Sequence, residues 1–112
     1  MKRVVITGIG AVTAFGKTWE DVKAAFQRKQ NAVQAKTEWA ERYPELGANL
    51  GAEIHDYNPP AHWNRKQLRS LGRVSQFAVE AAELALANAN LLDENGVILP
   101  YLKEGIMGWR TL

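Results

Sequence analysis

The chain has 112 residues and a mass of 12.5 kDa, which is room for one domain. It contains no cysteine, which excludes disulfides, thiolate metal sites and a cysteine nucleophile within these residues. Its formal charge of +2, from 14 Lys and Arg against 12 Asp and Glu, is too small a surplus to indicate nucleic-acid binding, which needs a concentrated basic face.

The first predicted element is a buried strand over about residues 3–7, because Val4-Val5-Ile6-Thr7 all favour β structure. A turn-rich loop follows, and its Gly8-Ile9-Gly10 sequence invites a dinucleotide-binding interpretation. Position 13 is threonine instead of Gly or Ala, and no acidic residue stands near Gln30. A tight turn that needs small residues is therefore the better interpretation, and no cofactor is predicted.

The uncharged run over residues 4–16 is shorter than the ~20 apolar residues that cross a bilayer, so no membrane segment is expected. Lys2-Arg3 before this run gives it the outline of a secretory signal. Its glycines and threonines suit a buried strand better than the apolar helix of a signal. We therefore expect a cytoplasmic chain.

A helix is predicted after Thr18, which is a good N-cap, and should run to about Arg28-Lys29. Its apolar positions Trp19, Val22 and Phe26 fall on one face, which should pack against another element. Residues 30–60 read as irregular, with one short strand over 50–54. So long an excursion is expected to be functional or to lie over a larger body.

The clearest element is a long helix that Asn64 can cap and that continues to about residue 89. Its apolar stripe is Leu68, Leu71, Val74, Ala78, Ala81 and Ala85. Alanines are frequent in its second half, so another element should approach it closely. A turn at Asn95-Gly96 and a second strand beginning at Gly105-Ile106-Met107-Gly108 complete the expected order.

The two histidines, His55 and His62, have no cysteine partner and no histidine at helical spacing, so each is interpreted as a loop residue and no metal site is predicted. Trp19 and Trp63 are interpreted as packing residues at helix starts instead of a stacking platform for bases.

One surface signal is a basic segment within residues 61–77, where no acidic residue occurs. Its cations are Arg65, Lys66, Arg69 and Arg73. On a continuous helix Lys66, Arg69 and Arg73 share one face, which could receive an acidic partner. The alternative is that these charges only solvate an exposed turn.

The opening run Arg3-Val4-Val5-Ile6-Thr7-Gly8-Ile9-Gly10-Ala11-Val12-Thr13-Ala14-Phe15-Gly16, followed by Trp19, closely resembles the start of β-ketoacyl-[acyl-carrier-protein] synthases of the thiolase-like superfamily. The runs Arg65-Lys66-Gln67-Leu68-Arg69 and Ser75-Gln76-Phe77-Ala78 and the alanine-rich helix fit the family's next block. The resemblance spans residues 2–108 in order and spacing.

The resemblance implies an α/β class fold: an incomplete N-terminal part of a thiolase-like α-β-α layered architecture, with residues 1–112 as a partial domain truncated after about residue 108. It also implies an acyltransferase that runs a decarboxylating Claisen condensation in fatty-acid, polyene or polyketide synthesis. In the family a cysteine holds the acyl chain and two histidines assist, all later in the full chain. Since no cysteine is present and His55 and His62 lie outside the family's histidine motifs, we expect this chain alone to be inactive.

The resemblance carries one site over by residue. In related synthases a lysine and an arginine at the positions of Lys66 and Arg69 receive the acidic recognition helix of the acyl carrier protein. With the rest of a synthase present, Lys66→Glu with Arg69→Glu should therefore weaken carrier-protein binding. The parent enzyme is expected to be a homodimer or a heterodimer with a related subunit.

Three departures from the family pattern stand out: Ala14 replaces a common proline, Arg28-Lys29-Gln30-Asn31 replaces a glycine-rich and serine-rich run, and Trp109-Arg110-Thr111-Leu112 replaces a Val-Ala-Tyr-Gly-Ser-like run. The first two suggest a divergent synthase. A one-base shift of codons for Val-Ala-Tyr can give Trp-Arg-Thr, so a frameshift is one hypothesis for the end, beside an interrupted gene or a truncation.

Two functional readings follow: the N-terminal fragment of a synthase, or a non-catalytic module that binds carrier protein or modulates a dimer.

Overall fold

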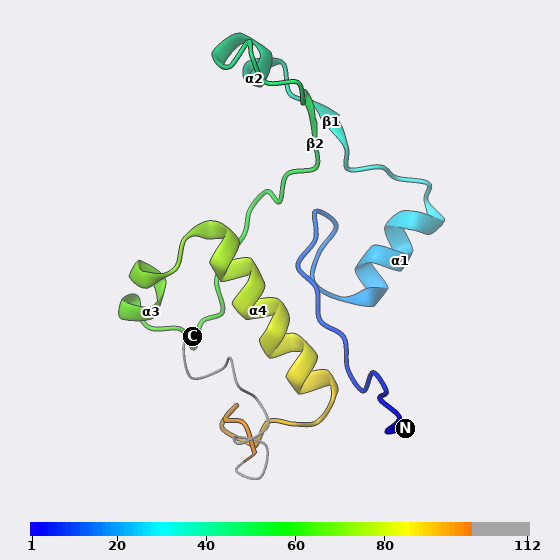
Figure 1. Cartoon of the computed structure of the whole chain (residues 1–112), viewed down its shortest axis with the longest axis vertical. Coiled ribbons are helices and arrows are strands. Elements are labelled where there is room, and N and C mark those ends of the chain that lie inside the picture. The colour runs from blue at the N-terminus through cyan, green and yellow to red at the C-terminus, as the bar shows by residue number, and fades with distance from the viewer. Residues whose placement is uncertain (100–112) are drawn as a thin grey trace. The chain divides into compact units, whose positions relative to one another are not determined.

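The computed structural model describes residues 1–99. In this range the elements in chain order are α1 (Trp19–Gln27), β1 (Gln34–Ala35), α2 (Thr37–Arg42), β2 (Leu50–Gly51), α3 (Arg65–Ser70) and α4 (Arg73–Asn88) (Figure 1). The chain divides into two compact units. The α4 unit consists of residues 1–12 and the described residues from 59 onward, and the α1 unit consists of residues 13–58. Each is described by itself.

The α4 unit is built on the longest described helix. α4 begins after Gly72 and ends at Asn88, and the amide of its C-cap, Ala89, donates to the carbonyl oxygens of Ala85 and Ala87. Asn90 then adopts a φ of 59°, the left-handed conformation that often ends helices. The predicted turn at Asn95-Gly96 is confirmed, because the Asp93 carboxylate accepts the amide hydrogens of Asn95 and Val97 at 2.9 and 2.8 Å.

Residues 1–12 do not form the predicted strand. The side chains of Val4, Val5 and Ile6 are 93%, 72% and 85% exposed. A β-strand satisfies its backbone groups only through a neighbouring strand, and the described residues supply none for this segment. The expectation of a strand within this chain by itself was therefore wrong, although the sequence retains β-favouring side chains.

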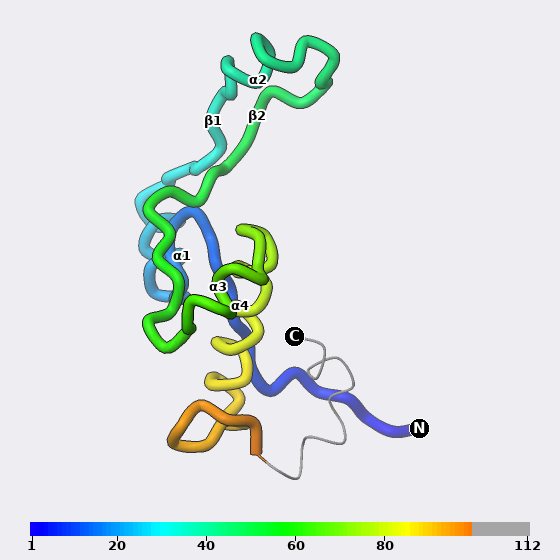
Figure 2. Tube along the Cα trace, turned by 90° about the vertical axis from the view of Figure 1, so that its left-hand side faces the viewer, coloured from blue at the N-terminus to red at the C-terminus, as the bar shows by residue number. Residues whose placement is uncertain are grey.

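The same segment explains why α4 is rich in small residues. A Cβ added at Gly8 would lie 2.5 Å from the Ala85 carbonyl oxygen, and one at Gly10 would overlap the backbone of Ala81 and Ala85. The predicted close approach to the alanine-rich helix is thus confirmed, and Figure 2 shows the segment running beside α4. The glycines of the Gly8-Ile9-Gly10 sequence serve helix contact instead of a tight turn.

The long helix predicted after Asn64 is two helices. Leu71, with φ −111° and ψ 121°, and Gly72, with φ −68° and ψ 169°, are extended and separate α3 from α4 (Figure 1). The predicted apolar stripe is interrupted at this point. Val74 is consequently 80% exposed, whereas Ala81 and Ala85 are partly covered.

In the α1 unit the Thr18 N-cap is confirmed, because its hydroxyl accepts the Asp21 amide hydrogen at 3.1 Å. Ala25 is the buried residue of α1, whereas Trp19 and Phe26, predicted to pack, are 64% and 59% exposed. A tight turn precedes the helix at residues 13–16, where Gly16 has a φ of 129° that favours glycine.

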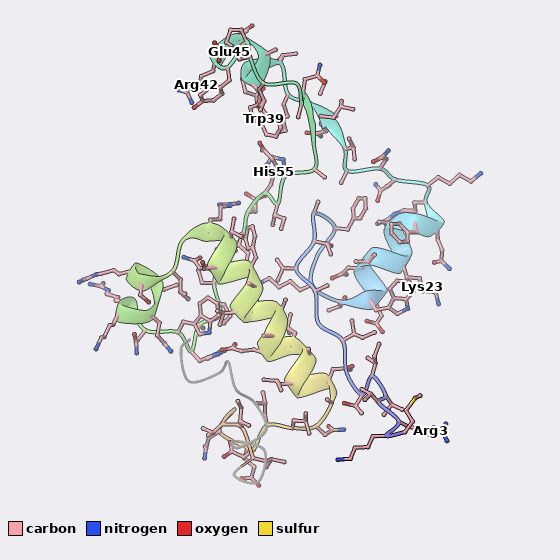
Figure 3. The ribbon with its side chains drawn as sticks, in the orientation of Figure 1. Arg3, Lys23, Trp39, Arg42, Glu45 and His55 are labelled. Carbon is pink, nitrogen blue, oxygen red and sulfur yellow. The ribbon has the colours of Figure 1, made fainter. Side chains whose placement is uncertain are left out.

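An arm, residues 34–51, extends the α1 unit. β1 and β2 pair antiparallel, with Gln34 opposite Gly51 and Ala35 opposite Leu50. The strand predicted over 50–54 is thus confirmed at its first two residues, whereas β1 and α2 were not predicted. Figure 3 shows Trp39 and Arg42 on α2 with Glu45 just beyond it.

The second strand predicted at residues 105–108 and the chain end at 109–112 lie outside the described residues. Over residues 1–99, none of the helices is long and apolar enough to cross a membrane.

Candidate functional site

The candidate binding residues Lys66 and Arg69 both lie on α3 and are exposed. Asn64 forms the predicted cap and more: its side-chain oxygen accepts the Gln67 amide hydrogen at 2.8 Å, while the Gln67 side chain accepts the Asn64 amide hydrogen at 2.9 Å. This reciprocal capping box satisfies two amide donors at the start of a helix only six residues long. Figure 3 shows nitrogen-tipped side chains projecting from α3.

The electrostatics of α3 are one-sided. Its first turn has no acidic residue, and within residues 1–99 neither Lys66 nor Arg69 forms an ion pair with an acidic side chain. Positive charge near a helix N-terminus is unfavourable with respect to the helix dipole. Lys66, in the first turn, therefore does not stabilise α3 through the dipole, whereas Arg69 lies in the last turn, where a cation is favourable. Both charges are open to an external anion.

Arg73 does not belong to this surface, contrary to the sequence expectation. The break at Leu71 and Gly72 places it at the first position of α4, so the spacing of three and four residues no longer sets one helical face. Its guanidinium lies 5.4 Å from the centre of the Phe77 ring, a cation–π distance. We therefore restrict the candidate surface to Lys66 and Arg69 on α3.

The segment before α3 is fixed to α4 by one carboxylate. Glu83 accepts a hydrogen bond from the Trp63 indole nitrogen at 2.9 Å through Oε1 and lies 3.0 Å from His62 Nε2 through Oε2. Trp63 is 7% exposed, so its predicted packing role is confirmed. His62 is a loop residue, as expected, but one that contacts α4.

Glu83 was not singled out by the sequence reasoning. The signal available was an acidic residue within an apolar, alanine-rich stretch, where a charge needs a specific partner. His55, the other histidine, is largely exposed and lies 3.8 Å from Glu53. Among residues 1–99, no three or more His, Asp or Glu side chains form a group that could hold a metal ion.

Several known proteins resemble the chain in sequence or in fold. No family model matches the chain. The chain is 30% identical to a 3-oxoacyl-[acyl-carrier-protein] synthase 2 of Synechocystis, over 99% of this chain and 27% of that protein. It is 31% identical to the protein of the same name in Staphylococcus aureus strain COL, over 98% of this chain and 27% of that protein.

A solved β-ketoacyl synthase from Burkholderia phymatum is 46% identical and superposes with a TM-score of 0.71. The match covers 84% of this chain and 23% of that one. The chain thus spans about a quarter of the length of the proteins it matches. In sequence and in its incomplete α/β fold, this chain corresponds to part of a β-ketoacyl synthase.

Proposed function

We propose that the chain forms the N-terminal part of a condensing enzyme, a 3-oxoacyl-[acyl-carrier-protein] synthase, with residues 1–112 as a partial domain. The supporting observation is the similarity to synthases along nearly the whole chain but only about a quarter of theirs. The complete enzyme would join an acyl thioester to malonyl carrier protein by decarboxylating Claisen condensation, in fatty-acid or polyketide synthesis. It would act in the cytoplasm as a homodimer or with a related subunit.

The chain by itself is proposed to be inactive. It has no cysteine to hold an acyl group as a thioester. Of its two histidines, His62 already contacts Glu83 and His55 is exposed on the irregular segment. Purified chain should give no condensation product from acyl and malonyl carrier protein, with the Synechocystis synthase as the positive control. Product formation above the enzyme-free rate would contradict the proposal.

The carrier protein is proposed to dock on α3 through Lys66 and Arg69. The observation that carries this is an exposed pair of cations on a capped helix, without an acidic partner in residues 1–99. Complementary charge steers association and fixes the register of a complex, and it loses strength as salt rises. An acidic helix of a carrier protein has the matching sign.

The test is charge reversal in a complete synthase that carries these residues. Lys66→Glu with Arg69→Glu should raise the KM for carrier-bound substrate about tenfold at low salt, because attraction becomes repulsion. The matched control is Arg28→Glu with Lys29→Glu at the end of α1, which makes the same change in net charge on exposed residues. Equal KM values for the two double variants would rule out α3 as the docking site.

The alternative is a non-catalytic module that binds carrier protein or modulates a dimer. A module must fold cooperatively alone, yet the buried apolar residues among the described ones are Ala25, Trp63 and Ile98. So small a core favours the fragment. A cooperative thermal melt with dispersed amide resonances would support the module, whereas a broad melt or aggregation supports the fragment.

A further inference from the structure

α3 is too short to be stable by local interactions alone. It has six residues, and isolated helices shorter than about 12–15 residues are marginal in water. Its capping box satisfies donors at its start but does not set its direction. The position of its cations must therefore come from contacts with another element, and α4 supplies them at both ends.

The first anchor holds the chain just before α3. Trp63 directly precedes the Asn64 cap, and its indole N–H donates to Glu83 Oε1 at 2.9 Å. His62 contacts the second oxygen of the same carboxylate at 3.0 Å. The Trp63 amide also donates to the Pro60 carbonyl oxygen at 3.1 Å, so this residue is held through both side chain and backbone.

The second anchor holds the chain just after α3. The Gln76 side-chain amide donates to the carbonyl oxygen of Leu71, the C-cap of α3, at 3.1 Å. Gln76 and Glu83 are seven residues apart on α4, about two helical turns, so both project from the same side of that helix. One face of α4 thus holds both ends of α3.

From this arrangement we propose that Glu83, with Gln76, is a positioning residue that orients the α3 cations toward the acyl carrier protein, an inference that rests on the docking function proposed above. Glu83 does not touch the carrier protein in this scheme. It acts through Trp63, by fixing the point from which α3 starts.

The charge of Glu83 makes the inference easy to distinguish from a purely electrostatic effect. Removing one negative charge near the basic helix would, by Coulomb attraction alone, strengthen binding of an acidic protein. Loss of positioning would weaken binding, because α3 would sample other directions and an ordering cost would then oppose the complex. The two explanations predict opposite signs for Glu83→Ala.

The experiment compares carrier-bound substrate with a small soluble thioester in the complete synthase. Glu83→Ala should raise the KM for carrier-bound substrate about tenfold, close to the lower end of the loss expected from one hydrogen bond to a charged group. Turnover of the small thioester should be unchanged, since it needs no docking helix. Glu83→Gln keeps an acceptor oxygen for the Trp63 indole and should restore most of the affinity.

Two further measurements exclude simpler explanations. Glu94→Ala, an exposed acid in the same unit, removes the same charge without touching Trp63 and should leave the KM unchanged or lower it. Hydrogen exchange over α3 should accelerate in Glu83→Ala and remain slow in Glu83→Gln. Equal loss with both substrates would indicate general destabilisation and overturn the inference.

The inference and the docking proposal fail in different ways. A normal or lowered KM in Glu83→Ala, while the Lys66→Glu with Arg69→Glu variant is impaired, overturns positioning and keeps docking. If instead the charge-reversed variant is normal, docking on α3 is wrong, and with it the purpose assigned to Glu83. Accelerated exchange in Glu83→Ala would then show only that α4 orders α3.

Discussion

α2 and α3 have the same length, six residues, but are held in different ways. α3 is fixed by polar side chains: its own capping box, Glu83 and Gln76. α2 has no side-chain cap, and the arm around it depends on Trp39 lying on Gly51 and on a buried cation, Lys36.

The difference decides which charges are left for other molecules. In the arm Lys36 is 6% exposed and its Nζ lies 3.0 Å from Glu53, so this cation serves the arm itself. In α3 the groups that hold the helix are neutral or belong to α4, and its own cations remain exposed. The cations of α3 therefore remain exposed for a partner, whereas the buried cation Lys36 is used by the arm.

The largest expected effect breaks the arm at its closest contact. A Cβ at Gly51 would lie 2.8 Å from Trp39 Cη2 and 3.5 Å from Lys36 Cγ. Gly51→Val should therefore displace the indole ring and destabilise the arm by about 3 kcal/mol, the upper end of typical overpacking costs. Amide exchange at position 36, whose N–H donates to the Asn49 carbonyl oxygen at 2.7 Å, measures the opening.

The matched control lies at the joint between α3 and α4. Gly72 has no atom within 4 Å of an added Cβ and a φ of −68°, which any residue adopts. Gly72→Ala should be neutral or slightly stabilising, because it only restricts the unfolded chain. A cost at Gly72 similar to that at Gly51 would mean that both helices depend on close apolar contact, and the comparison would fail.

A smaller effect separates the stem of Lys36 from its charge. The Glu53 side chain is 43% exposed, which weakens the ion pair through solvent screening. Lys36→Ala removes both the packed stem and the pair and should cost about 2 kcal/mol, whereas Lys36→Met keeps the stem and should cost less than about 1 kcal/mol. The stability costs of the two variants are measured by denaturation followed at the β1 and β2 amides. Equal costs would assign the effect to charge alone.

The smallest effect concerns the caps. Asn64→Ala and Thr18→Ala each remove a side-chain cap worth about 1 kcal/mol. The nine-residue α1 should only fray, but α3, with six residues and the Gln67 amide hydrogen left without its side-chain acceptor, should lose most of its helicity. Backbone chemical shifts report both helices. Retention of α3 in Asn64→Ala would show that the anchors to α4 suffice without the cap.

Local signals in the sequence predicted local structure well. The caps at Thr18 and Asn64 and the turn at Asn95-Gly96 each involve groups within a few residues of one another, so the structure reproduces them. The single long helix was wrong, although Gly72 in its middle was a usable warning. That break removed Arg73 from the predicted basic face and left Lys66 and Arg69.

The sequence by itself determined the family pattern, the starts of α1 and α3 and the cations of α3, because these depend on neighbouring residues and side-chain type. Only tertiary structure decided the rest. The β-favouring residues 4–7 form no strand, since strand pairing needs a partner segment. The purpose of Gly8 and Gly10 and the link from Glu83 to Trp63 arise between residues distant in the chain, because packing and hydrogen bonding act through space and leave no mark in local spacing.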